Sequence, residues 1–349
     1  MLKFSFMRKL FFMAALASVA FASCTKDENF YENESTNQEI SFTPVNHKPG
    51  SRAMINGTAY PKEVPFKVWA WNGANSDGSN SNIFMNGVEV KFHELGTIDA
   101  WAPDVPYYWP SGEKVDFFAV SPSSSSLKPT VTSSTDIKIS DYTVNSTYST
   151  PDAVDLMYAE KVKGLSNNTT SGSSLNLRDG VGLTFKHALA QVKFKVNMKD
   201  PSSTSRTMVL KSIKMEGVNT MNTLSFAGND LTASWGTSKT SGTWEKTELN
   251  TNITTSPSEI IGTTSTDGWI VLPQTVADGI KVTLTVSIKG QANTEYVAQL
   301  NKASSNAISD WVMGKIYTYN ITLNAVSPNE IFFVPSVTDW VNEAGNIEL

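Results

Sequence analysis

The sequence predicts an all-β protein built from sandwich domains. Its clearest feature is a strict alternation of apolar and polar residues, which gives a strand one buried and one exposed face. Three segments show this alternation: Val192–Met198, Val282–Ile288 and Tyr317–Leu323. Charged residues make up only 17% of the chain, a composition that suits extracellular β-rich proteins. Sheets that each bury one face pack most simply as the two layers of a sandwich.

Shorter apolar runs predict five further strands, at Ile40–Thr43, Phe66–Trp71, Val115–Val120, Leu210–Met215 and Trp269–Leu272. Loops rich in Ser, Asn and Gly separate them, at residues 72–82, 121–136 and 163–174. A short helix is predicted only near Ala303–Trp311. Because a chain of 349 residues exceeds a usual single domain, we expect an N-terminal sandwich over residues 38–178 and a C-terminal sandwich over residues 179–349.

The N-terminus has the pattern of a bacterial export signal. A basic segment precedes the apolar run Leu10–Phe21, which is too short to span a bilayer. Cys24, the only cysteine of the chain, ends the segment Phe21-Ala22-Ser23-Cys24, which resembles a lipobox. We therefore expect residues 1–23 to be a lipoprotein signal peptide, with acyl chains such as palmitate anchoring the protein through Cys24. An ordinary secretory signal with an incidental cysteine is the alternative.

Residues 24–37 are polar, and they cannot bury enough apolar surface to fold by themselves. We interpret them as a lipidated tether. The acidic residues after Cys24 resemble the signal by which some Gram-negative bacteria pass lipoproteins to the outer leaflet of the outer membrane. A surface-exposed lipoprotein of the outer membrane is the resulting expectation, and a tether without such a signal is the alternative.

The charge of the chain argues against nucleic acid as a partner. Its formal net charge is −5, and loss of residues 1–23 removes three basic residues and no acid, which lowers the value to −8. Proteins that bind nucleic acid through the phosphate backbone present a basic surface instead.

No motif for catalysis or for a cofactor occurs in the sequence. It lacks HExxH, GxSxG, a P-loop and GxGxxG, and the histidines His47, His93 and His187 are scattered. Ser111 and Lys114 have the S-x-x-K spacing of acyl-serine enzymes without the accompanying elements, so we interpret them as part of a turn. His187 is interpreted as a structural residue rather than a general base. We therefore expect no enzymatic activity, no cofactor and no metal ion.

Nine tryptophans have two candidate uses. Core packing is the commoner use within strands, and stacking against sugars is the alternative. Trp101, Trp235 and Trp244 stand among polar residues, so they are the best candidates for an exposed, glycan-binding surface.

Several short blocks follow one another in an order that carries more information than any block alone. They are Phe66–Ala70, Tyr107–Pro110, Val115–Ala119, Asp155–Ala159, Leu183–Val192, Trp269–Gln274, Trp311–Tyr317 and Val337–Trp340. Behind a lipobox, this order resembles the fimbrillin family of outer-membrane lipoproteins and fimbrial subunits. The resemblance covers about residue 38 to the C-terminus, and it implies two transthyretin-like β-sandwich domains in tandem and a structural role.

The resemblance also implies a mode of assembly. Subunits of that family are exported as lipoproteins, cut after an arginine in an early loop and joined to other subunits by strand exchange. Arg52 matches that arginine, so Ala53 would begin the processed subunit, and an uncut Arg52 is the alternative. Cleavage would free the strand Glu39–Thr43, and the segment after Asn324 is the candidate donor strand. A C-terminal tail that stays on its own domain is the other interpretation.

Two functions therefore stay open at this point. The first is a structural subunit of a cell-surface fimbrium, whose partners are other fimbrial subunits and, through its lipid, the outer membrane. The second is a monomeric surface lipoprotein or tip adhesin that binds a glycan or a host protein. Filaments that contain the chain are expected only in the first case.

Overall fold

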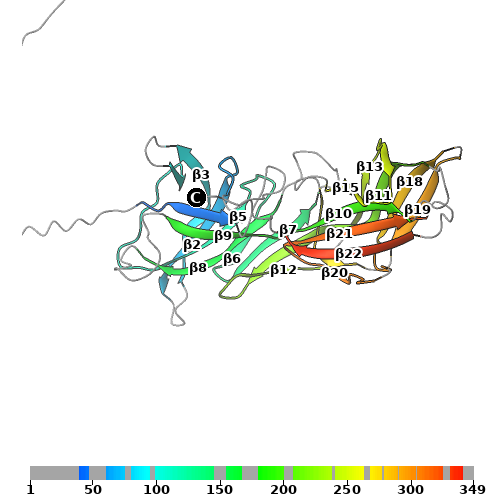
Figure 1. Cartoon of the computed structure of the whole chain (residues 1–349). Helices are drawn as coiled ribbons and strands as arrows, with labels where there is room; N and C mark the ends of the chain where they lie inside the picture. Colours follow the sequence, from blue (N-terminus) through cyan, green and yellow to red (C-terminus); the bar gives the residue numbers. More distant parts are fainter. Residues whose placement is uncertain are drawn as a thin grey trace, which may run out of the picture. The chain divides into compact units, whose positions relative to one another are not determined.

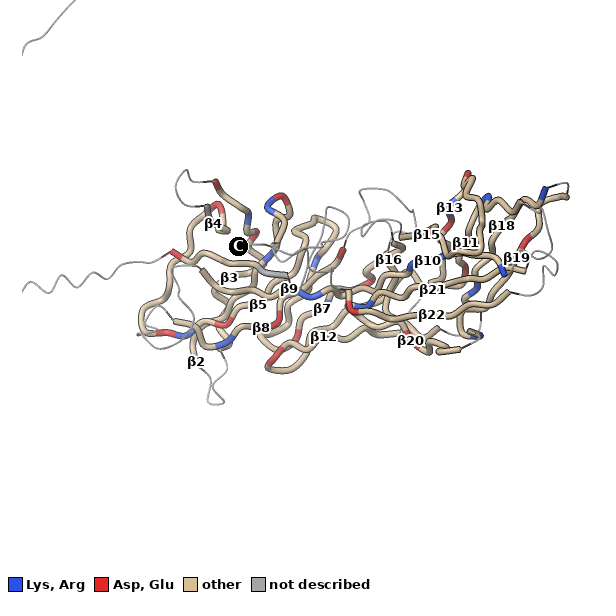
Figure 2. The backbone as a smooth tube through the Cα atoms, in the orientation of Figure 1, with Lys and Arg blue, Asp and Glu red and all other residues tan. Residues whose placement is uncertain are grey.

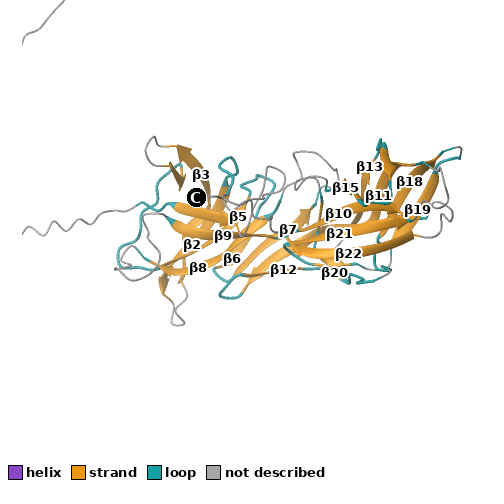
Figure 3. Cartoon of the chain, in the orientation of Figure 1, coloured by secondary structure: helices purple, strands orange, loops and turns teal. Residues whose placement is uncertain are grey.

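The computed structural model describes residues 39–46, 60–74, 80–94, 99–144, 155–166, 180–199, 207–237, 240–262, 268–276, 279–289, 291–303, 305–324 and 331–340. They form strands, turns and loops, and none of them is helical (Figure 3). The all-β prediction is confirmed. The short helix predicted near Ala303–Trp311 is wrong, because the described residues there form bends and the strand β20 (Asp310–Trp311). Nothing in the described ranges is a helix able to cross a membrane.

Seven strands of the N-terminal part form a closed barrel (Figure 1). In their order around the barrel they are β1 (Phe42–Asn46), β4 (Asp99–Pro103), β3 (Asn80–Glu94), β2 (Phe66–Ala74), β5 (Val115–Ser121), β8 (Met157–Leu165) and β9 (Val181–His187). The barrel closes because β1 pairs with β9 on one side and with β4 on the other. β1 is therefore the strand that completes this sheet.

Two further sheets contain most of the described strands outside the barrel. The first contains β15 (Ser258–Ile261), β10 (Ala190–Met198), β21 (Lys315–Leu323) and β22 (Ile331–Asp339), with β16 (Trp269–Val271) paired to β10. The second contains β19 (Thr294–Gln299), β18 (Lys281–Ile288), β11 (Met208–Ala227), β7 (Asp136–Thr143) and β6 (Thr130–Ser133), with β12 (Thr232–Trp235), β13 (Thr240–Lys246) and β14 (Thr251–Ile253) paired to β11. β17 (Gln274–Thr275) and β20 form a small separate sheet.

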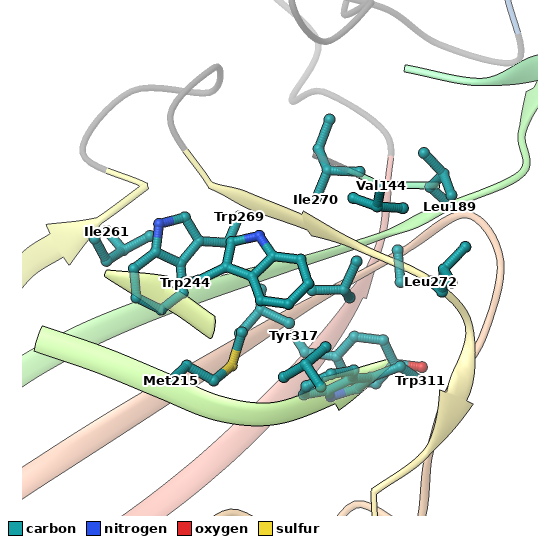
Figure 4. Close-up of a cluster of buried hydrophobic side chains, with 14 of the residues drawn as sticks. Val144, Leu189, Met215, Trp244, Ile261, Trp269, Ile270, Leu272, Trp311 and Tyr317 are labelled. Atoms are coloured by element: carbon teal, nitrogen blue, oxygen red, sulfur yellow. The ribbon is translucent and has the colours of Figure 1, made fainter. Parts of the chain in front are cut away.

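The core of the C-terminal part is rich in large aromatic side chains. Figure 4 shows Trp244 of β13, Trp269 of β16, Trp311 of β20 and Tyr317 of β21 in one cluster of buried side chains. These strands belong to three different sheets, so the cluster fills the space between layers as the inward faces of a sandwich do. Aromatic side chains of this size bury 150–250 Å² each and dominate core energetics.

The pairing of strands does not follow the predicted domain boundary between residues 178 and 179. β9 follows this boundary in the sequence, yet it pairs with β1 and β8 of the barrel. β6 and β7 precede it, yet β7 pairs with β11 of the C-terminal part. The division into two domains over 38–178 and 179–349 stays a prediction.

β5 packs on both of its faces, and every one of its residues is buried. Phe117 points into the barrel, where its ring lies 5.8 Å from that of Phe42. Phe118 points the opposite way, and its ring lies 4.9 Å from that of Phe226 in β11. A strand covered on both faces has a continuous apolar run instead of an alternating one, which explains the pattern of residues 115–120.

An ion pair is buried beside β5. Asp116 Oδ2 lies 3.3 Å from Lys161 Nζ of β8, and both side chains are almost completely shielded from solvent. Lys161 Nζ also donates to Ser134 O at 3.0 Å, and Gly164 N donates to Asp116 Oδ1 at 2.8 Å. These hydrogen bonds satisfy both charged groups inside a low-dielectric environment.

We expect Asp116→Ala to lower the free energy of unfolding by about 3–5 kcal/mol, because it leaves the Lys161 charge buried without its partner. The double variant Asp116→Leu/Lys161→Met should recover most of this loss. Asp230→Ala is the matched control: it breaks the exposed pair with Lys163 and should change the free energy by about 0–1 kcal/mol. Denaturant titrations of the three variants measure the differences. A loss as small as that of Asp230→Ala would contradict a buried pair.

Candidate functional site

The first strand of the barrel, β1, lies between two neighbours and is held by both. It runs parallel to β9 over all five of its residues, with Phe42 opposite Val181 and Pro44 opposite Leu183. On the other side, Phe42 is opposite Trp101 of β4. The segment before β1 continues these contacts, since Ile40 N donates to Tyr107 O and Val181 N donates to Ser41 O, both at 2.8 Å.

One face of this segment points into the barrel. The side chains of Ile40 and Phe42 are 1% and 3% exposed, and Pro44 is also buried. The Phe42 ring meets the ring of Phe66 edge to face at 6.2 Å between centroids. Ser41 and Thr43, on the other face, are half-buried. The strand predicted at Ile40–Thr43 is present but shifted, since β1 covers Phe42–Asn46. The inward side chains of Ile40, Phe42 and Pro44 fill the apolar space between β4 and β9, called the groove below.

An aromatic cluster forms the floor of this groove. Tyr60 packs against Phe66, Trp101 and Phe185, with ring centroids 4.9–5.5 Å apart. Its hydroxyl group forms a hydrogen bond with that of Ser121, and burial raises the pKa of Tyr60 well above its ordinary value. The phenol is thus neutral and fully inside the core. Loss of β1 would expose part of this cluster to water.

Gly180 allows the backbone of β1 to approach closely. It has a φ of +86°, and a Cβ atom at this position would lie 2.8 Å from Phe42 N and from Ser41 C. No side chain fits there without displacing the strand. The groove is therefore shaped for a backbone that passes directly over Gly180.

The C-terminal strand, β22, pairs with β21 in antiparallel register from Ile331, opposite Leu323, to Asp339, opposite Lys315 (Figure 1). It is the last strand of its sheet, and among the described strands only β21 pairs with it. Its outer face carries exposed apolar side chains: Phe332 is 39% exposed and Val334 is 43% exposed. No charged residue occurs between Ile331 and Thr338 (Figure 2). Natural proteins usually protect such an edge, because it can pair with another chain.

The end of β22 is fixed by Trp340. Its ring stacks on His187 at 4.1 Å between centroids with an interplanar angle of 4°, and its backbone N–H donates to Gly314 O at 2.7 Å. His187 Nδ1 in turn lies 2.9 Å from Asp155 Oδ2 in a buried pair. His187 Nε2 and Trp340 Nε1 are buried without a hydrogen-bond partner. His187 is therefore packed between Asp155 and Trp340, and its interpretation as a structural residue stays a prediction.

Of the residues predicted from the sequence to be functional sites, Cys24, Arg52 and Ala53 lie outside the described residues. β1 ends at Asn46, and the next described residue is Tyr60, so Arg52 belongs to the connection between this strand and the rest of the barrel. Lipidation and cleavage stay predictions.

In the part of the chain that the structure describes, the three tryptophans considered for a glycan-binding surface do not form an exposed platform. Trp101 and Trp244 are buried, and Trp235 is half-buried with its Nε1 donating to Ala188 O at 2.7 Å. Six further tryptophans are also buried: Trp69, Trp71, Trp109, Trp269, Trp311 and Trp340. Core packing, the commoner use expected of the tryptophans, is confirmed for eight of the nine. The exposure considered for Trp101 and Trp244 is wrong, because both side chains lie on the buried face of their strands, and Trp235 is half-buried.

The chain is similar to known proteins both in sequence and in fold. A family model described as fimbrillin-like matches residues 51–340. The chain belongs to the fimbrillin-like family. Among solved structures, the fold is similar to that of a fimbrial protein from Bacteroides vulgatus, with a TM-score of 0.59 and 14% identity over 87% of this chain and 100% of that one.

A solved structure from Bacteroides uniformis, whose protein is described as a proposed cell adhesion protein, gives a TM-score of 0.49 and 17% identity over 88% of this chain and 99% of that one. Comparison with curated proteins gives no match. The fimbrillin-like resemblance stated from the sequence is therefore confirmed. Sequence reasoning missed Tyr60, Gly180 and the contact of Trp340 with His187, since they depend on residues distant in the sequence.

Proposed function

We propose that this fimbrillin-like protein is a structural subunit of a cell-surface fimbrium, exported as a lipoprotein through Cys24 and assembled by strand exchange. Its partners are other subunits of the same or a related kind and, through the lipid, the outer membrane. Family membership supports the fimbrial role rather than an enzymatic one.

The observation that supports the assembly step is the position of β1. This strand completes the barrel and fills an apolar groove, yet it is joined to the rest of the chain through the segment that contains Arg52. After a cut between Arg52 and Ala53, only non-covalent contacts would hold it. A vacated groove would then present both apolar pockets and the edges of β4 and β9 to a strand of another subunit.

Surface material shed from cells tests this function. Immunogold labelling should show filaments that carry the chain along their length, and N-terminal sequencing of the filaments should begin at Ala53. A monomeric protein that begins at Cys24 would contradict the proposal and support a monomeric surface lipoprotein. Labelling confined to filament ends would instead support a tip adhesin that binds a glycan or a host protein.

Cys24→Ala is expected to shift the protein from the membrane to the soluble fraction, because acylation requires the thiol group. The described residues begin at Glu39 and the first strand at Phe42, so the sheets should be unaffected and the circular dichroism spectrum should not change. Detergent partitioning of the variant and the unmodified chain measures the shift. Equal partitioning of the two proteins would overturn the lipid anchor while leaving the fimbrial role open.

A further inference from the structure

A cavity lies between β8 of the barrel and the hairpin that β11 and β12 form. Its volume is about 370 Å³, within the range of about 300–1,000 Å³ that is usual for small-molecule sites. One wall comes from β8, through Tyr158, Glu160 and Lys161, and the other comes from residues 230–233. We call this cavity the β8–β12 pocket. The described residues that line it include none from β1, so the pocket is separate from the groove that the proposed assembly uses.

The most buried part of the lining is apolar and aromatic. Leu231 and Tyr158 are buried, and Ala233 is half-buried. The Tyr158 ring packs on that of Phe226 in β11, with 5.2 Å between their centroids, so its position is fixed by the core. Burial raises the pKa of Tyr158, so its hydroxyl group stays neutral and can donate or accept a hydrogen bond. The pocket therefore offers a fixed apolar surface to a ligand.

The exposed part of the lining carries two carboxylates, one from each wall. The side chain of Glu160 is 62% exposed and pairs with Lys186 of β9. The side chain of Asp230 is 74% exposed and pairs with Lys163 of β8. An ammonium group donates hydrogen bonds and a carboxylate accepts them, so each pair places a donor beside an acceptor. Thr232, which is also exposed, adds a hydroxyl group to the same rim.

The charges around the pocket are balanced. Besides the two pairs at the rim, the third charged residue of the lining, Lys161, lies 3.3 Å from Asp116 in the buried ion pair described above. A charged ligand would have to displace one of these pairs or bring a further charge out of water, and both are costly. A neutral hydroxyl group avoids this cost, because it can donate to a carboxylate and accept from the lysine beside it. The lining therefore favours a neutral ligand that carries several hydroxyl groups.

We infer that the β8–β12 pocket is a binding site for one ring of a neutral saccharide. A pyranose ring has an apolar face of C–H groups, which matches the surface of Tyr158 and Leu231, and neighbouring hydroxyl groups, which match the rim. Asp230 and Glu160 accept hydrogen bonds from these hydroxyl groups and fix the orientation of the sugar. The site differs from the tryptophan surface considered from the sequence, and it does not depend on assembly. In a filament it would be repeated along the surface, which strengthens attachment to a multivalent glycan.

Saturation-transfer NMR of the full chain tests the ligand class. The probes are glucose, galactose, mannose and N-acetylglucosamine, with glucuronic acid as the charged comparison. At least one neutral sugar should receive saturation from the protein, and glucuronic acid should bind more weakly than that sugar because its carboxylate meets a balanced rim. Asp230→Ala should weaken binding of the same sugar about tenfold or more, since a hydrogen bond to a charged acceptor is lost.

Two further variants show whether the effect belongs to the pocket. Glu259→Ala is the matched control, because it breaks a comparable exposed pair, with Lys195 at 3.0 Å, outside the pocket and should leave binding unchanged. Thr232→Phe places a large ring at the rim without changing any charge, so it should also weaken binding. Asp230 and Thr232 are exposed, so both variants should fold, and denaturant titration checks this.

The outcomes separate this inference from the proposed function. No saturation transfer to any of the neutral sugars would overturn the saccharide site, as would tighter binding of glucuronic acid. Equal affinities in Asp230→Ala and Glu259→Ala would place the sugar elsewhere on the protein and overturn the pocket. Filaments that form normally from a chain that binds no sugar would leave the fimbrial role intact, and a chain that binds sugar without forming filaments would leave the pocket intact.

Discussion

Replacing Arg52 with alanine is expected to abolish filaments while leaving a folded subunit. If cleavage after Arg52 is what releases β1, the variant keeps this strand covalently attached. The strand then continues to fill the groove and to pair with β9 and β4, so no donor strand can enter. Electron microscopy and size-exclusion chromatography should show monomers only. N-terminal sequencing should give no chain that begins at residue 53.

Arg178→Ala is the matched control for this experiment. It removes the same side chain at a position outside the connection between β1 and Tyr60, so filaments should form normally. Filaments that contain uncut Arg52→Ala subunits would show that release of β1 through this arginine is not required. Loss of filaments in both variants would indicate a general defect in export or folding instead.

The sequence predicted the strands well wherever one face of a strand is buried. Val192–Met198, Val282–Ile288 and Tyr317–Leu323 lie within β10, β18 and β21, because alternation reports directly on a half-buried strand. The 20 residues of β11 show why bounds are harder to predict. Their pattern changes along the strand as it passes from one partner to another, including β18, β13 and β7.

Burial of single side chains was harder to predict than strands. Trp244 stands between threonine and glutamate, yet it is buried, since neighbours in a strand point to opposite faces. The groove around β1 depends on pairings between residues more than 100 positions apart, such as Phe42 with Val181. Local patterns carry no signal for such pairs.

Trp340→Ala is expected to have a large effect on stability. The indole ring is 2% exposed and stacks flat on His187, which is itself held by Asp155. Removing a buried tryptophan side chain costs about 3–5 kcal/mol, because it loses transfer free energy and leaves a cavity. Denaturant titration measures this change in the free energy of unfolding. Val337→Ala, at a half-exposed position of the same strand, should change it by only about 0.5 kcal/mol.

The same substitution should also release β22. The indole ring of Trp340 joins the end of this edge strand to β9, since it stacks on His187, the last residue of β9. Without the indole ring, the end of the strand loses its stacking contact with His187 and keeps its pairing with β21 and its backbone bond to Gly314, so its amide hydrogens should exchange faster with solvent than in the unmodified chain. Trp340→Phe preserves an aromatic ring for stacking and should restore most of the protection. If β22 exchanges at the same rate in Trp340→Ala and in the unmodified chain, Trp340 does not hold the strand in place. If it exchanges faster and β22 is the donor strand of the proposed exchange, the cleaved Trp340→Ala subunit should also begin to polymerise sooner, because this strand leaves its own sheet more readily.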